Sequence, residues 1–65
     1  MKLLLNGEPI TTEVATLDAV LIENGYAEAT VATAVNGEFV PATLRAAHTL
    51  SEGDQIEVLA PMQGG

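Results

Sequence analysis

The chain has 65 residues, which favours a single domain over residues 1–65, because chains of this length rarely support two hydrophobic cores. Nine acidic residues against Lys2 and Arg45 give a net charge of −7, and two separated basic residues argue against nucleic acid as a partner, since phosphate backbones are bound by clustered Lys and Arg. The absence of cysteine and of any apolar run long enough for a signal peptide or a membrane span predicts a cytoplasmic protein that does not associate with a membrane.

The first predicted element is a β-hairpin. Two β-capable runs flank Asn6-Gly7 in the segment KLLLNGEPITTEV. Asn-Gly is a strong hairpin signal because both central residues of the tight turn need positive φ. Pro9 cannot donate a hydrogen bond to a neighbouring strand, so we expect the second run to form an edge strand.

A single helix is predicted over residues 17–24. Thr16 can cap its first turn, apolar side chains follow at helical spacing, and Gly25 is a natural stop. The apolar stripe predicts that one face of this helix packs on a sheet.

The second half of the chain contains a second hairpin and a last strand. Residues 31–35 and 38–40 flank Asn36-Gly37, and Pro41 ends the second arm. We expect one helical turn at 44–47, a tight turn at 52–54 and a strand from residue 55 to residue 60. In this strand Leu59 falls on the opposite face from the buried positions.

Five short strands and one helix predict an α+β fold. The economical arrangement is one mixed sheet of four to five strands curled over the helix, with the last strand beside the first. This is the β-grasp, or ubiquitin-like, architecture. It leaves one sheet face open, and Leu59 on that face is a candidate contact residue.

The side chains predict a protein that is not itself an enzyme. The sequence lacks a nucleophile motif, a phosphate-binding loop and the alternating carboxylates of a calcium loop. The single histidine, His48, is best explained by a structural or surface role, because a general base needs an oriented partner in a cleft. We therefore expect no metal site and no bound cofactor.

The C-terminal residues 61–65 are predicted to form an extended, flexible tail. Pro61 ends the strand, and no pattern fixes the residues after it, which are Met62, Gln63, Gly64 and Gly65. A frayed chain end is the plain alternative. A Gly-Gly end, however, can enter a narrow channel, and the carbonyl carbon of Gly65 has no side chain to hinder attack.

Three segments of the chain, AVNGEFVP, EGDQIEV and PMQGG, resemble the ThiS family of bacterial sulfur carrier proteins of thiamine biosynthesis. The similarity spans essentially all 65 residues. The resemblance implies that a ThiF-like adenylyltransferase uses ATP to convert the Gly65 carboxylate to an acyl adenylate. Sulfur from a cysteine desulfurase then gives a thiocarboxylate, which a ThiG-like thiazole synthase receives.

The resemblance also implies roles for the residues before Gly65. Leu59 and the open sheet face would contact the adenylating enzyme, and the residues lining the approach to its active site would be Met62, Gln63 and Gly64. The protein would be a carrier substrate, monomeric when free. Its acidity would serve solubility or, alternatively, attract a basic partner surface.

A Gly-Gly end is also compatible with other functions. It also occurs in the small subunit of molybdopterin synthase, in sulfur carriers for tRNA thiolation and cysteine synthesis, and in ubiquitin-like protein modifiers. The short chain and the PMQGG ending favour the thiamine carriers. A plain interaction domain with an irrelevant tail is a further alternative.

Overall fold

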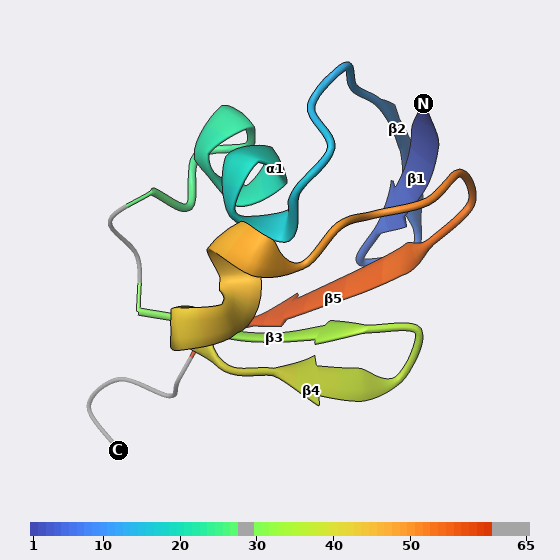
Figure 1. Ribbon diagram of the computed structural model, residues 1–65. Coiled ribbons are helices and arrows are strands. Elements are labelled where there is room, and N and C mark those ends of the chain that lie inside the picture. The colour runs from blue at the N-terminus through green and yellow to red at the C-terminus, as the bar shows by residue number, and fades with distance from the viewer. Residues whose placement is uncertain (28–29, 61–65) are drawn as a thin grey trace.

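The computed structural model describes residues 1–27 and 30–60 of the protein (Figure 1). The predicted tail over residues 61–65 lies outside these described residues. The elements in chain order are β1 (Lys2–Leu5), β2 (Glu8–Thr11), α1 (Leu17–Glu23), β3 (Ala32–Val35), β4 (Glu38–Val40), the 3-10 helix η1 (Ala42–Ala47) and β5 (Gln55–Leu59).

The strands form one mixed sheet in the order β2-β1-β5-β3-β4. The last strand, β5, runs parallel to β1 and antiparallel to β3, and each hairpin is antiparallel. The predicted β-grasp arrangement is therefore confirmed, as is the edge position of the strand that contains Pro9. The single helical turn predicted at 44–47 is a longer 3-10 helix, Ala42–Ala47.

Both hairpin turns have the backbone geometry that the Asn-Gly pairs predict. The φ angles are 52° and 83° at Asn6 and Gly7, and 53° and 84° at Asn36 and Gly37. Positive φ at both central positions matches the right-handed twist of the flanking strands, which keeps each hairpin in register.

The helix α1 ends one residue earlier than predicted and has a cap at each end. The Thr16 hydroxyl accepts a hydrogen bond from the Ala19 amide at 3.3 Å. At the other end, Gly25 has a φ of 91° and the Tyr26 amide donates to the Leu21 carbonyl at 2.8 Å. This is a Schellman motif, which satisfies carbonyl groups that the last helical turn leaves free.

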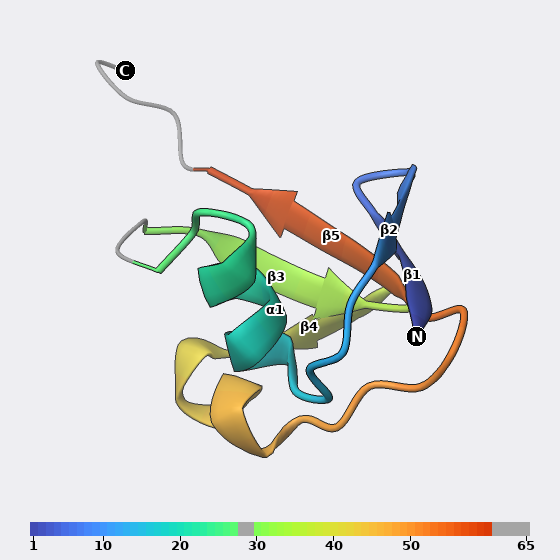
Figure 2. The same cartoon turned by 90° about the horizontal axis from the view of Figure 1, so that it is seen from above.

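The core lies between α1 and one face of the sheet. Figure 2 shows the helix across that face, with η1 beside it. The buried apolar side chains are Leu3, Leu17, Val20, Leu21, Val35, Val40, Leu50, Ile56 and Val58. Each such side chain contributes about 1.5–3 kcal/mol through burial. Within residues 1–27 and 30–60, no helix or strand covers the other face of the sheet, here called the outer face.

Candidate functional site

The C-terminal strand β5 presents alternate side chains to the two faces of the sheet. Ile56 and Val58 are buried in the core, while Glu57 and Leu59 point to the outer face. Leu59 is 71% exposed. Its predicted position on the open face is confirmed, and it indicates a contact surface where other exposed apolar side chains lie beside it.

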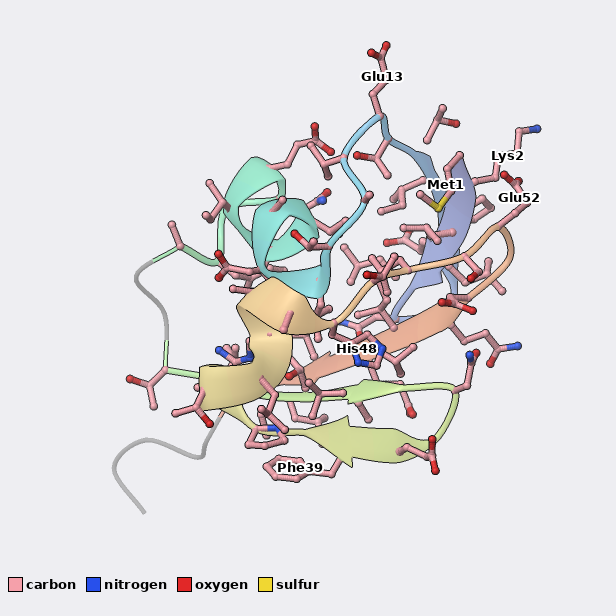
Figure 3. All side chains as sticks on the ribbon, in the orientation of Figure 1. Met1, Lys2, Glu13, Phe39, His48 and Glu52 are labelled. Atoms are coloured by element: carbon pink, nitrogen blue, oxygen red, sulfur yellow. The ribbon has the colours of Figure 1, made fainter. Side chains whose placement is uncertain are left out.

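Phe39 is a second exposed apolar side chain on the outer face, and the sequence reasoning missed it. Phe39 is 68% exposed, and Figure 3 shows it projecting from β4 on the side away from α1. The pairing of residues in the second hairpin is enough to predict the position of Phe39. Val35 pairs with Glu38 across the two-residue turn, so Phe39 must lie on the opposite face from the buried Val35.

A shallow pocket lies between these two apolar side chains. Ala34 pairs with Phe39 on one side and with Glu57 on the other, and Ala32 pairs with Leu59. The residues that line this outer-face pocket are Ala32, Thr33, Ala34, Phe39, Glu57 and Leu59. Because alanine side chains are short, the middle strand forms a floor between taller side chains on β4 and β5.

Two asparagines hold β5 from opposite sides, beyond the ends of the regular ladders. The Asn6 amide donates to the Ile56 carbonyl at 2.8 Å, and the Asn6 Oδ1 accepts from the Val58 amide at 2.8 Å. Asn36 binds Gln55 in the same way. The Asn36 amide donates to the Gln55 carbonyl at 2.7 Å, and the Asn36 Oδ1 accepts from the Gln55 amide at 3.0 Å. The strand that leads to the C-terminal residues is therefore fixed at both edges.

Arg45 fixes η1 to the start of β3, beside the end of β5. Its Nε donates to the Thr33 Oγ1 at 3.0 Å, and its Nη2 donates to the Val31 carbonyl at 2.7 Å. Thr33 is buried and donates in turn to the Val40 carbonyl at 2.8 Å. The guanidinium thus serves internal structure on the core side of the sheet.

Near the other end of β5, the Asp54 side chain and the His48 backbone make structural hydrogen bonds. Asp54 accepts hydrogen bonds from the Asn36 Nδ2 at 3.0 Å and from the Ser51 amide at 2.9 Å, and these bonds lower the pKa of its carboxyl below 3.8. The His48 carbonyl accepts from the Leu17 amide at 3.0 Å. Within residues 1–27 and 30–60, no three His, Asp or Glu side chains are placed to hold a metal ion.

The remaining predicted site residues lie outside the part of the chain that the structure describes. They are Met62, Gln63, Gly64 and Gly65. The described chain reaches Ala60, which lines an apolar depression with Leu59 and Val31 next to the outer-face pocket. The predicted contact residue Leu59 therefore lies close in sequence and in space to the last described residue.

None of the helices in the described ranges is both long and apolar enough to cross a membrane.

Comparisons with known proteins agree with this geometry. A crystal structure of the thiamine biosynthesis protein ThiS from Geobacter metallireducens is similar, with a TM-score of 0.83, 33% sequence identity and 100% of both chains covered. A solution structure of a thiamine biosynthesis protein from the same organism has a TM-score of 0.77 and 32% identity, over 100% of this chain and 88% of that chain. A search of curated proteins finds no match. The model of the ThiS family matches residues 3–65, and the chain therefore belongs to the ThiS family.

Proposed function

We propose that the protein is a sulfur carrier of thiamine biosynthesis and that the sulfur is carried on the Gly65 carboxyl group. The observation that carries this proposal is the family match, which extends over residues 3–65 and so includes the C-terminal Gly-Gly. The similar structures described as thiamine biosynthesis proteins support the same pathway. They favour it over molybdopterin, tRNA thiolation, cysteine synthesis and protein modification.

The proposed chemistry is done on Gly65 by partner enzymes. A ThiF-like adenylyltransferase binds ATP, the Gly65 carboxylate attacks the α-phosphorus, and pyrophosphate leaves. A cysteine desulfurase supplies a persulfide whose sulfur displaces AMP from the acyl adenylate, and a thiol reductant then releases the C-terminal thiocarboxylate. The thiocarboxylate is an anionic nucleophile that can give its sulfur to the substrate of a ThiG-like thiazole synthase. The protein needs no bound cofactor for this role.

The fold supports the proposal because β5, the strand that precedes the reacting end, is held in place by hydrogen bonds. The Asn6 and Asn36 side chains accept hydrogen bonds from β5 amides and fix the strand on both edges. We infer that Leu59 and Phe39 on the outer face contact the adenylating enzyme, since both are apolar and largely exposed. In this arrangement the residues that enter its active site are Met62, Gln63, Gly64 and Gly65.

The test is intact mass spectrometry of the protein after incubation with ATP, a ThiF-like enzyme, a cysteine desulfurase and cysteine. We expect one oxygen atom of the C-terminal carboxyl group to be exchanged for sulfur. A variant with one residue added after Gly65 is the matched control, and it should not react, because its terminal carboxylate is displaced from the active site.

Two other results would contradict the proposal. No exchange with any adenylating enzyme of this type would exclude the carrier function. Conjugates of higher mass, formed by an isopeptide bond from Gly65 to lysine and abolished when Gly65 is deleted, would instead identify a protein modifier.

A further inference from the structure

The outer-face pocket combines one carboxylate with one aromatic ring across three neighbouring strands. Glu57 on β5, Ala34 on β3 and Phe39 on β4 form a single cross-strand row. Adjacent strands lie about 4.8 Å apart, so the backbones of Glu57 and Phe39 are roughly 10 Å apart. The short side chain of Ala34 leaves the space between them open, and Leu59 closes one end.

These walls match the chemistry of an arginine side chain. A guanidinium group is planar, so it can donate two parallel hydrogen bonds to a carboxylate while its face stacks on an aromatic ring. The ammonium group of lysine is compact and strongly hydrated, and it offers neither the paired bonds nor the stacking face. Leu59 and the alanine floor suit the aliphatic part of the arginine.

Neither of the protein's own basic side chains lies in this pocket. Lys2 and Arg45 are the only lysine and arginine in the sequence. Arg45 donates to Thr33 and to the Val31 carbonyl on the core side of the sheet. Lys2 lies on β1, and Figure 3 shows it far from Phe39, which lines the pocket. A cation opposite Glu57 must therefore come from another molecule.

We propose that the outer-face pocket receives an arginine side chain of the adenylating partner, held between Glu57 and Phe39 with Leu59 alongside. This inference rests on the proposed function, because it names the chemistry by which that partner recognises the carrier. The contact is next to the chain that leads to Gly65, so it also helps to align the reacting end. A net charge of −7 favours a partner surface that is basic around this arginine.

The first experiment compares Glu57→Gln with Glu38→Gln in direct binding to the ThiF-like enzyme by calorimetry. Glu38 is a suitable control because it is an exposed carboxylate next to Phe39 on β4. It pairs with Val35, so it lies on the opposite face of the sheet from Phe39. We expect Glu57→Gln to raise the Kd about tenfold, through loss of a charge-assisted pair, and Glu38→Gln to change it less than about twofold. Thermal unfolding of both variants checks that they are folded.

The second experiment identifies the arginine with double-mutant cycles. Each surface arginine of the enzyme is replaced by lysine and measured against the wild-type carrier and against Glu57→Gln. We expect one replacement that weakens binding to the wild type but adds no further loss in the Glu57→Gln background. The Phe39→Leu variant should also weaken binding, since it keeps an apolar side chain but removes the ring.

The outcomes separate this inference from the proposed function. If Glu57→Gln binds like Glu38→Gln, if no arginine is coupled to Glu57, or if the wild type does not bind the enzyme, the pocket assignment is wrong. If sulfur exchange at Gly65 still occurs normally when Glu57 proves unimportant for binding, the proposed function stands alone. If binding depends on Glu57 but no sulfur exchange is found, the pocket stands and the carrier function fails.

Discussion

At the scale of single residues, Asp54 shows how one side chain joins two turns. Its carboxylate accepts one hydrogen bond from the Asn36 side chain in the second hairpin turn and one from the Ser51 amide in the turn before β5. Both bonds favour the charged form, and they lower its pKa below the ordinary 3.8. The effect of Asp54 on stability must therefore depend on pH.

The sign of this dependence follows from proton linkage. The folded protein holds the Asp54 proton less tightly than the unfolded chain, so the contribution is present above pH 3.8 and is lost as pH falls through the lower folded pKa. We expect Asp54→Ala to lower the free energy of unfolding near neutral pH, with a smaller difference from wild type in strong acid. Urea unfolding of both proteins over this pH range measures the difference in free energy of unfolding. A difference that stays constant with pH would contradict the role assigned to the charged form.

At the scale of elements, β5 depends on side chains as well as on its ladder. The β1 and β5 ladder pairs only Leu4 with Gln55 and Leu5 with Ile56, and Asn6 then extends it through its own Oδ1. The amide that it satisfies belongs to Val58, which is buried. A buried donor without a partner costs about 1–3 kcal/mol, so this one bond matters to a small domain.

Substitution of Asn6 tests this contribution. In Asn6→Gly the positive φ remains accessible, and only the side-chain bond is lost, so we expect the free energy of unfolding to fall by about 1–3 kcal/mol. In Asn6→Ala the same bond is lost and the φ of 52° adds strain of about 1 kcal/mol or more. Urea unfolding of the two variants separates these effects. A Gly variant as stable as the wild type would show that the bond to Val58 is unimportant.

The elements that the sequence predicted well are those that depend on local chemistry. The two Asn-Gly turns, the Thr16 cap and the Gly25 stop each follow from a few adjacent residues. The 3-10 helix was predicted too short at its start, where a backbone bond from the Leu44 amide to the Pro41 carbonyl closes the first turn and no side chain caps it. A helix start without a capping side chain leaves no residue pattern that predicts it.

The candidate site was predicted only in part. The position of Leu59 follows from the alternation along β5, and the same reasoning applied to the second hairpin would have placed Phe39 on the outer face. The pocket itself needs the register of three strands, because its floor and walls come from β3, β4 and β5. One sequence does not give that register until the sheet order is known.

At the scale of the whole molecule, the protein combines a net charge of −7 with a sheet face that no element within residues 1–27 and 30–60 covers. The core occupies the other face, under α1. Acidity of this size serves solubility, but it also creates a field that acts on a charged partner before contact. The two roles differ in what they predict for the rate of association.

If the acidity attracts a basic surface on the ThiF-like enzyme, the association rate constant should fall as salt is added, because the Debye length shrinks from about 30 Å at 0.01 M to about 3 Å at 1 M. We expect a decrease of about tenfold or more across this range, with a much smaller change in the dissociation rate constant. Stopped-flow binding measures both. The control is Glu13→Gln, which neutralises a carboxylate in the loop after β2, distant in Figure 3 from Phe39, and should weaken the salt dependence less than Glu57→Gln. An association rate that does not respond to salt would leave solubility as the reason for the charge.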